Sequence, residues 1–336
     1  MNETLLRVDN LKTSFMTSNG EVQAVRGVSF EVRRGEIVGI VGESGSGKSI
    51  TNMTLLKLLP DTAVIKDGRA MFQGQDLTKL SMKELRKIRG EKIAMIFQDP
   101  MSSLNPLIPV GEQVAEIIRI HHSDRSREAV KQEVLKRFAE VRIPEPEKRY
   151  HAYPHEFSGG MRQRVMIAMA LANNPELLIA DEPTTALDVT IQDQIIRQMR
   201  ELKEQHGTSI IFITHDLGVI AELCEKVEVM YGGLIMEEAP IDELFEHPSH
   251  PYTLGLLESM PSIQQDKAER LIPIPGSPPD MTNPPAGCPF APRCRYARKI
   301  CAAELPELQP VGERHSARCW LLDPEAPAEQ NPFKKR

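Results

Sequence analysis

The chain has 336 residues, of which 40% are apolar and 26% are charged, the balance of a globular protein with a sizeable core. Its net charge of −6 excludes the basic surface of a nucleic-acid binder, so we expect no nucleic-acid partner. No apolar run reaches the roughly 18–20 residues that span a bilayer, and the first residues lack the apolar core of a signal peptide. We expect a protein that stays in the cytosol and reaches a membrane only by docking on another protein.

A glycine-rich stretch follows a series of short strands predicted within residues 5–40. The apolar run at 36–41 leads into GESGSGKS at 42–49, and residues 50–56 space apolar side chains as a helix does. Strand, loop and helix form the context of a phosphate-binding loop, where backbone N–H groups and a helix N-terminus point at one anion. Lys48 is expected to bridge the β- and γ-phosphates, and the Ser49 hydroxyl to bind Mg²⁺. The nucleotide-binding residues expected here are Gly42, Ser44, Gly45, Ser46, Gly47, Lys48 and Ser49.

The rest of the chain alternates strands and helices until about residue 255. A basic helix at 82–89 precedes a buried strand at 93–97, and residues 99–157 predict a helical insertion. Further buried strands are expected at 177–180 and 209–213, and a hairpin about Gly232 and Gly233. This order predicts an α/β fold with a mostly parallel sheet. The proline-rich residues 256–336 predict a loop-rich extension with little regular structure.

Polar residues end three of the predicted strands. Asp181 is expected to hold Mg²⁺ opposite the loop serine, and Glu182 to orient and polarise the water that attacks the γ-phosphate. His215, at the end of another strand, is placed to reach the γ-phosphate. Gln98 is placed to sense Mg²⁺ or the attacking water. A solvated acidic pair and a structural histidine are the alternative interpretations.

A second potential anion site lies about 110 residues after the first. Ser158, Gly159 and Gly160 open a predicted helix, and a serine hydroxyl with two glycines at a helix N-terminus can bind phosphate. An ordinary helix cap explains the same residues. A dimer explains why one chain has two phosphate sites. The glycine-rich loop of one subunit and the Ser-Gly-Gly of the other could close on the same nucleotide.

These motifs occur in the order and spacing of the ABC transporter ATPases, which residues 1–255 resemble. The resemblance implies a P-loop, RecA-like fold with an antiparallel β subdomain. It makes Asp181 the Mg²⁺ ligand of the Walker B motif, and Glu182 the catalytic base. Asp188, after Ala186 and Leu187, would lie at a dimer interface, and His215 would be the switch histidine. Gln98 would face a membrane partner, while Phe15 takes the place of an aromatic residue that stacks on adenine.

One variant motif narrows the resemblance. The family signature Leu-Ser-Gly-Gly-Gln reads FSGGM at 157–161, which loses the amide at Met161. FSGGM, the stretch at 97–106 and HPYT at 250–253 resemble the dipeptide/oligopeptide import ATPases, with similarity to about residue 320.

The narrower resemblance implies an ATP-hydrolysing subunit that energises peptide uptake and binds ATP between its Walker A loop and a partner's signature motif. The partners implied are a second, different ATPase subunit, two membrane permease subunits and an extracellular solute-binding protein. It implies a peripheral location on the cytoplasmic face of the membrane.

Four cysteines gather in the extension, namely Cys288, Cys294, Cys301 and Cys319. Their C-x5-C-x6-C-x17-C spacing lacks the close pair of a zinc site and the common ferredoxin pattern, so it leaves metal binding and free thiols open. A weakly structured, proline-rich segment favours a stabilising metal. The resemblance implies a [4Fe–4S] cluster on these four residues, with zinc second and free thiols third. Cys224 is expected to pack in the core.

Other functions stay open at this point. The same subunit type serves importers of nickel or other small solutes. A non-transport ABC ATPase acting on DNA or ribosomes usually carries two nucleotide domains or a long coiled coil, and neither is present. A regulatory module that only binds nucleotide does not need a water-activating base, so Glu182 and His215 argue against it.

Overall fold

The computed structural model describes residues 3–98, 103–185, 188–260, 273–327 and 331–333. The chain forms two compact units, each drawn from separate stretches of sequence. The first unit is Met1–Glu3, Arg33–Ile37 and Lys79–Ile213, and the second is Thr4–Val32, Val38–Thr78 and Thr214–Arg336. Each unit is described on its own below.

Three parallel strands form the centre of the first unit. They are β6 (Ile93–Ile96), β7 (Leu177–Asp181) and β8 (Ser209–Thr214). Strand β7 lies in the middle, so that Ala180 pairs with Ile96 on one side and with Phe212 on the other. The side chains of β7 and β8 are buried along the whole strand, as expected of a parallel sheet covered on both faces.

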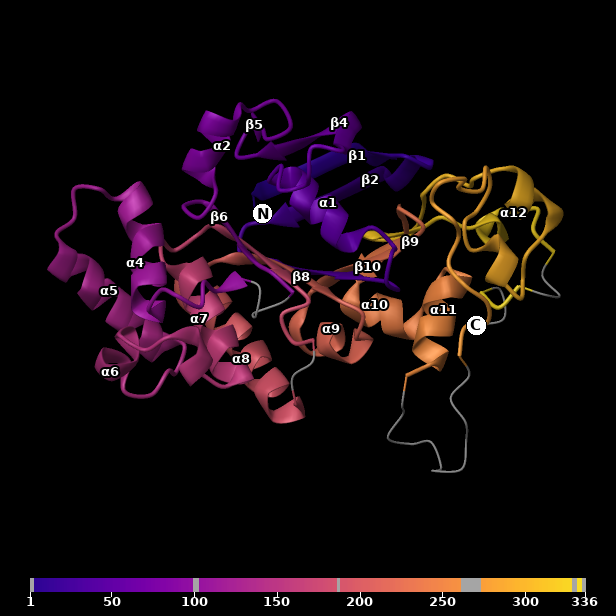
Figure 1. Ribbon diagram of the computed structural model, residues 1–336. Coiled ribbons are helices and arrows are strands. Elements are labelled where there is room, and N and C mark those ends of the chain that lie inside the picture. The colour runs from indigo at the N-terminus through magenta and orange to yellow at the C-terminus, as the bar shows by residue number, and fades with distance from the viewer. Residues whose placement is uncertain (1–2, 99–102, 186–187, 261–272, 328–330, 334–336) are drawn as a thin grey trace. The chain divides into compact units, whose positions relative to one another are not determined.

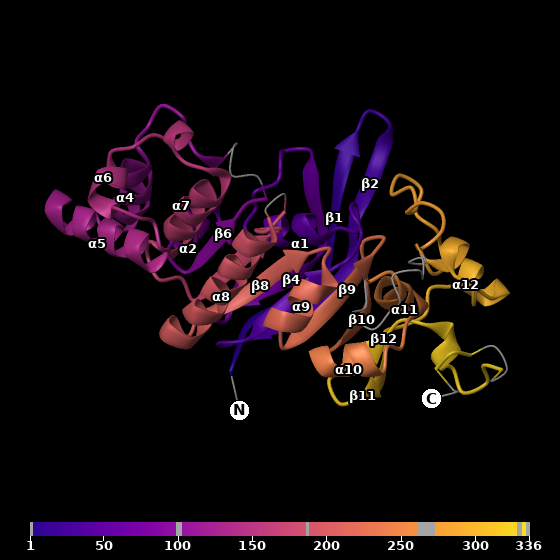
Figure 2. The ribbon, with the colours of Figure 1, turned by 90° about the horizontal axis from the view of Figure 1, so that it is seen from below.

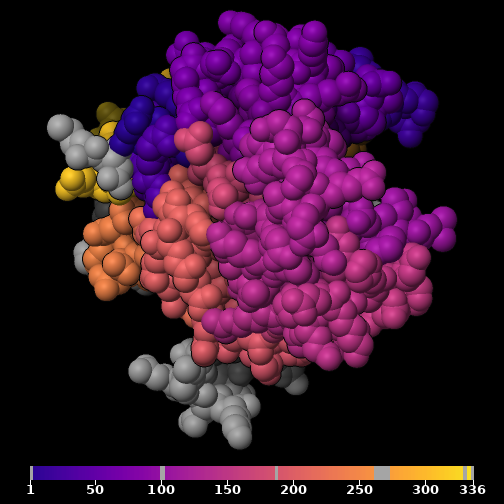
Figure 3. All heavy atoms as spheres, turned by 90° about the vertical axis from the view of Figure 1, so that its left-hand side faces the viewer, coloured from indigo at the N-terminus to yellow at the C-terminus, as the bar shows by residue number. Residues whose placement is uncertain are grey.

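Six α-helices of the first unit lie within the described residues. They are α2 (Met82–Ile88), α4 (Val110–His121), α5 (Arg127–Glu140), α6 (Pro146–Tyr150), α7 (Gly159–Leu171) and α8 (Val189–His206). Helices α4 to α6 form the predicted insertion and gather beside α7 (Figures 1 and 2). The buried Arg137 of α5 bonds Glu133, Glu140 and Asn174, which joins that helix to the residues after α7. The atoms of the insertion, in magenta, face the viewer in Figure 3.

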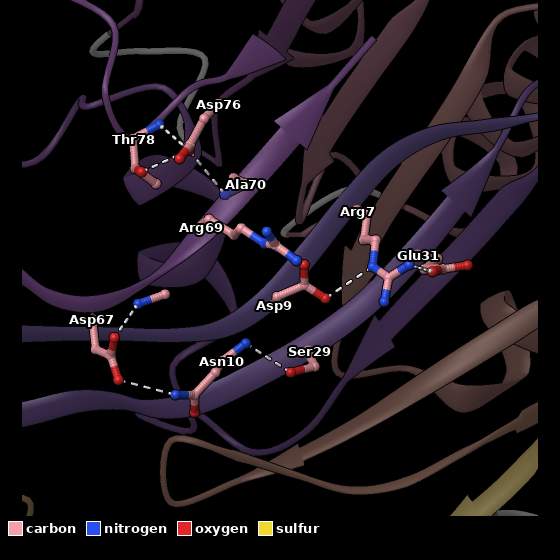
Figure 4. Close-up of polar contacts among 11 residues, drawn as sticks. Arg7, Asp9, Asn10, Ser29, Glu31, Asp67, Arg69, Ala70, Asp76 and Thr78 are labelled. Carbon is pink, nitrogen blue, oxygen red and sulfur yellow. Dashed lines mark hydrogen bonds and ion pairs between the residues drawn. The ribbon is translucent and has the colours of Figure 1, made fainter. Parts of the chain in front are cut away.

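A four-stranded sheet in the second unit has the order β2–β1–β4–β5. Its strands are β1 (Thr4–Thr17), β2 (Gly20–Arg33), β4 (Ala63–Phe72) and β5 (Gln75–Asp76). The predicted short strands thus merge into two long ones. Asp9 of β1 accepts from Arg69 of the neighbouring strand β4 at 2.8 Å and from Arg7 of its own strand at 2.9 Å, as Figure 4 shows. Strands β1, β4 and β5 pair antiparallel, which gives the antiparallel subdomain.

A mixed set of strands forms the rest of the second unit's sheet structure. Strand β3 (Ile37–Val41) runs parallel to β9 (Lys226–Tyr231), which forms the predicted hairpin with β10 (Leu234–Pro240). The helices of this unit are α1 (Lys48–Leu55), α9 (Leu217–Leu223), α10 (Ile241–Glu246), α11 (Pro251–Glu258) and α12 (Lys299–Ala303). Within the described ranges, no helix has the length and apolar character needed to cross a membrane.

The C-terminal extension holds more regular structure than its proline content predicts. Strands β12 (His315–Ala317) and β11 (Gln309–Gly312) add to the edge of β10, in yellow in Figure 2. The buried carboxylate of Glu237 in β10 bonds the ring of His315 in β12 at 2.8 Å and accepts from the backbone N–H groups of Ser249 and His250. Sheet pairing and a buried hydrogen-bonded carboxylate therefore hold the extension against the rest of the second unit.

Candidate functional site

The loop at residues 42–47 joins β3 to α1, and its path requires glycine at two points. Gly42 has φ 155° and Gly47 has φ 101°. A Cβ atom on Gly42 would lie 2.1 Å from the Met230 carbonyl oxygen, and one on Gly47 would lie 2.6 Å from that of Ala24. Because backbone stands in the way at both places, a side chain there would force the loop to change course.

Polar groups inside this loop suit a phosphate. The Lys48 ammonium donates to the carbonyl oxygens of Gly42 at 2.7 Å and of Glu43 at 3.0 Å. The Ser46 Oγ is buried and has no hydrogen-bond partner among the described residues. A buried donor without a partner is costly unless a ligand bonds it. An ammonium, this hydroxyl and the start of α1 therefore fit a phosphate group.

Glu43 makes contacts that the sequence did not predict. Its carboxylate accepts two hydrogen bonds from the Arg293 guanidinium, and its backbone N–H donates to the Tyr252 hydroxyl at 2.9 Å. Arg293 lies 250 residues further along the chain and belongs to no motif that sequence patterns single out. Only the fold brings this residue to the loop.

Glu182 lies directly after β7 in the first unit. Its carboxylate accepts from the Gln98 amide at 3.0 Å and from the Thr185 hydroxyl at 2.8 Å. Its backbone has φ 45°, a left-handed conformation that is unusual for glutamate, and its N–H bonds the Ile213 carbonyl oxygen at 2.9 Å. Strain of this kind persists where surrounding bonds hold it, often at functional sites. Asp181, one residue earlier, is buried at the strand end.

Two helix starts in the first unit carry the other residues predicted there. Ser158 caps α7, with its hydroxyl accepting from the Met161 N–H at 3.3 Å. Asp188 caps α8 through the Ile191 N–H at 3.0 Å. The predicted Ala186 and Leu187 lie outside the described residues. At the start of α7, Gly159 is exposed and a Cβ on it would meet nothing within 4 Å, whereas a Cβ on Gly160 would lie 3.2 Å from the Ile191 side chain.

The two remaining nucleotide candidates lie in the second unit. Phe15 is half-buried in β1 opposite Ala63 of β4. His215 is exposed between β8 and α9, where the strand end predicts it. Phe15, residues 42–49 and His215 thus belong to the second unit, and Gln98, residues 158–160, Asp181, Glu182 and Asp188 to the first.

The four cysteines of the extension line one pocket, together with Tyr296 and Trp320 among other residues. Backbone N–H groups donate to two of the sulfurs, Arg298 to Cys301 at 3.4 Å and Leu321 to Cys319 at 3.5 Å. Burial raises the pKa of the Cys288 and Cys294 thiols to about 11.

The thiols are not set for a single ion. In the ranges that the structure covers, no three His, Cys, Asp or Glu side chains are arranged to hold one. An iron–sulfur cubane carries one iron for each thiolate, so its ligands stand further apart than those of one ion.

Cys224 has a different setting. It follows the last residue of α9 and is buried, and its sulfur lies 3.2 Å from where a Cβ on Gly39 would be. Burial raises the pKa of its thiol. The expected packing role in the core is confirmed.

Two family models match the chain. The model described as ABC transporter matches residues 25–185, which contain the glycine-rich loop and Glu182. The model described as oligopeptide/dipeptide transporter, C-terminal region, matches residues 236–301, which contain Arg293 and three of the four clustered cysteines.

Similar proteins of known name cover nearly the whole chain. The oligopeptide transport ATP-binding protein OppD of Bacillus subtilis is 54% identical over 98% of this chain and 92% of its own length. The dipeptide transport ATP-binding protein DppD of Lactococcus lactis is 50% identical over 97% of this chain and 93% of its own. Among solved structures, a dimeric ATP-binding cassette in a post-hydrolysis state with ADP and phosphate matches with a TM-score of 0.64 and 29% identity, over 70% of this chain and 98% of that one.

Proposed function

The chain belongs to the ABC transporter family, and from this premise we propose that it is the ATP-hydrolysing subunit of a membrane importer for dipeptides or oligopeptides. One observation carries the peptide assignment: the C-terminal region at 236–301 matches the oligopeptide/dipeptide transporter type, in addition to the nucleotide-binding region. We assign residues 1–255 to the nucleotide-binding domain and residues 256–336 to the extension.

Residues 42–49 are proposed as the phosphate site. Lys48 would exchange the loop carbonyl oxygens that it now bonds for phosphate oxygens, and Ser46 Oγ would gain a partner. Ser49, Asp181 and Gln98 would supply the oxygen ligands that suit Mg²⁺, and Mg²⁺ would neutralise phosphate charge. Phe15 would stack on adenine.

Glu182 is proposed as the group that orients and activates water. The Gln98 amide and the Thr185 hydroxyl hold its carboxylate in one orientation, which supports this role. His215 would contact the γ-phosphate. Lys48, Gln98, Glu182 and His215 together would act by positioning and charge compensation, which dominate phosphoryl transfer.

ATP would be shared with a second ATPase subunit, a different one as in a heterodimer. Ser158, Gly159 and Gly160 would face the partner's phosphates, with Asp188 at the interface. The exposed Gly159 at the start of α7 supports this assignment, since a helix N-terminus can bond an incoming anion.

The insertion is proposed to dock on one of two membrane permease subunits, at the cytoplasmic face of the membrane. The apolar side chains of Leu107 and Ile120 are 82% and 67% exposed there and are available for such a contact. An extracellular solute-binding protein would deliver the peptide.

Reconstitution tests the function. The chain, a second ATPase subunit and two permease subunits would be placed in proteoliposomes with the binding protein, and ATP-driven uptake of a labelled tripeptide measured. Uptake that requires ATP and stops with Glu182→Gln is expected. Uptake of nickel in place of peptide would replace the peptide assignment, and ATP hydrolysis without permease binding would favour a non-transport ATPase.

We also propose that Cys288, Cys294, Cys301 and Cys319 hold a [4Fe–4S] cluster as a structural staple, with zinc as the second choice. The shared pocket and the N–H bonds to sulfur support this proposal. Anaerobic purification should give brown protein with iron, sulfide and absorbance near 400 nm. Colourless protein that contains zinc and no iron would contradict the cluster.

A further inference from the structure

The contact between Glu43 and Arg293 brings a cation of the C-terminal extension against the phosphate-binding loop. Nη1 of Arg293 donates to one carboxylate oxygen of Glu43 at 2.7 Å, and Nη2 donates to the other at 3.0 Å. This is the bidentate geometry of a strong arginine–carboxylate pair. The Arg293 side chain is 5% exposed and that of Glu43 is 27% exposed. Solvent therefore screens this pair much less than a surface pair.

Arg293 is fixed by the residues around it. Its Nη1 donates to the Tyr231 hydroxyl at 3.0 Å, its Nε to the Pro275 carbonyl oxygen at 2.7 Å, and its Nη2 to that of Ile274 at 3.2 Å. The guanidinium also lies 5.6 Å from the Tyr231 ring centre and 5.9 Å from that of Phe290, within cation–π range. The position of the cation is thus set by the extension and by β9, and does not depend on Glu43 alone.

Glu43 has an unusual chemical setting. It is the second residue of a loop whose ligand carries several negative charges, and its backbone carbonyl oxygen bonds the Lys48 ammonium at 3.0 Å. An unpaired carboxylate at this place would repel a polyphosphate and compete with it for Lys48. The pair with Arg293 removes that net charge. The Tyr252 hydroxyl accepts from the Glu43 backbone N–H, and the Tyr252 ring packs 5.2 Å from that of Phe290 in the extension.

We propose that Arg293 is a positioning residue for nucleotide binding, which cancels the charge of Glu43 and holds the start of the phosphate-binding loop. The inference rests on the proposed role of residues 42–49 as the nucleotide loop. It gives the C-terminal extension a direct part in setting the affinity for ATP, through a residue that touches the loop and not the nucleotide.

Opposite effects of the two partners are the test. Binding of the fluorescent nucleotide mant-ATP with Mg²⁺ would be titrated for wild type, Arg293→Gln, Glu43→Gln and the double variant. Arg293→Gln leaves a bare carboxylate and should weaken binding roughly tenfold, while Glu43→Gln leaves an extra cation and should tighten it about threefold. The double variant restores neutrality and should return to within about twofold of wild type. Both single effects should shrink in high salt.

Arg295→Gln is the matched control. Arg295 is the extension's neighbouring arginine, exposed and paired with Glu258, so the same change of charge occurs away from the loop. Wild-type affinity is expected for it. Arg293→Gln at wild-type affinity, equal weakening by both single variants, or a double variant as weak as Arg293→Gln would each overturn the proposal.

Folding and the underlying function are checked separately. Circular dichroism and thermal unfolding report whether Arg293→Gln folds. If Arg293→Gln does not fold, the Glu43→Gln variant tests the proposal alone. Weaker nucleotide binding by Glu43→Gln would contradict the proposed charge cancellation. ATP hydrolysis should follow binding, with KM raised by Arg293→Gln and kcat changed little. If wild type does not bind mant-ATP, or if Lys48→Ala binds as tightly as wild type, the nucleotide assignment of the loop has failed instead.

Discussion

Two carboxylates, one in each unit, are held in contrasting ways. Glu43 in the phosphate-binding loop pairs with a buried guanidinium, and its backbone is bonded to Tyr252. Glu182 after β7 accepts from a neutral amide and a neutral hydroxyl, on a backbone in the left-handed region. The first carboxylate is neutralised by its partner, and the second is oriented by donors that carry no charge.

The difference between the donors of Glu43 and those of Glu182 follows from the role proposed for each residue. A loop that binds polyphosphate works against any negative charge nearby, so its carboxylate needs a cation. A group that activates water must present a carboxylate oxygen as an acceptor, and a bidentate arginine would occupy both oxygens. With the roles proposed above, the described donors of Glu43 are those of a structural carboxylate and the described donors of Glu182 suit a catalytic one.

The largest expected effect is on Glu182. Glu182→Gln should slow ATP hydrolysis by roughly 10²–10³-fold, because the amide keeps the shape but cannot accept a proton from water. Nucleotide binding should persist, so the variant should accumulate an ATP-bound dimer. Phosphate release and light scattering measure the two quantities. Glu201→Gln, which changes an exposed glutamate paired with Arg142, is the control. Wild-type hydrolysis by Glu182→Gln would remove the assignment of the base.

The loop itself should be sensitive at one glycine and tolerant at another. Gly42→Ala would place a Cβ 2.1 Å from a backbone oxygen, whereas at Gly45 a Cβ would meet nothing within 4 Å. The first should cost about 3 kcal/mol in free energy of unfolding and the second about 1 kcal/mol, since both have positive φ but only one collides. Urea unfolding of both variants measures the gap. Equal losses would mean that backbone strain alone sets the glycine requirement.

Lys48 tests whether the loop that contains Glu43 binds nucleotide. Lys48→Ala should weaken nucleotide binding roughly 10–100-fold, the value of one or two charge-assisted hydrogen bonds. Titration with mant-ATP measures the change, and Lys66→Ala, at an exposed lysine paired with Glu21, is the control. An affinity equal to wild type would contradict the assignment of residues 42–49 as the nucleotide-binding loop.

Sequence patterns predicted the parts of the molecule that depend on local chemistry. Glycine spacing located the loop, uninterrupted apolar runs located β7 and β8, and paired glycines located the β9–β10 hairpin. The helices of the insertion also follow their apolar period. These signals survive because the local sequence and the fold favour the same structure.

Contacts between residues far apart in the chain could not be predicted from the sequence. The composition of the extension predicts loops, yet β12 pairs with β10 because its backbone meets an open strand edge. The pairs of Arg293 with Glu43 and of His315 with Glu237 join residues that are 250 and 78 positions apart. Nothing in the spacing of these residues marks them, since an arginine or a histidine in a loop is usually solvated.

A lowered pH offers the smallest test, and it acts on the residues that hold the backbone of Glu43. His250 caps the helix that carries Tyr252, and its Nδ1 accepts from the Tyr252 N–H at 3.0 Å. Burial, with Arg318 nearby, lowers the pKa of His250 from 6.5 to about 3. The unfolded chain therefore binds a proton that the folded chain refuses, and stability falls as the pH drops from about 6.5 towards 3.

At pH 5 this single group should cost about 2 kcal/mol of stability relative to pH 7. His250→Asn keeps an acceptor at the helix cap but does not titrate, so its loss of stability between pH 7 and pH 5 should be smaller by that amount. Urea unfolding at both pH values gives the comparison, with His247→Asn, at an exposed neighbour, as control. If His250→Asn loses as much stability between pH 7 and pH 5 as the wild type, then protonation of His250 does not cause the loss of stability in acid.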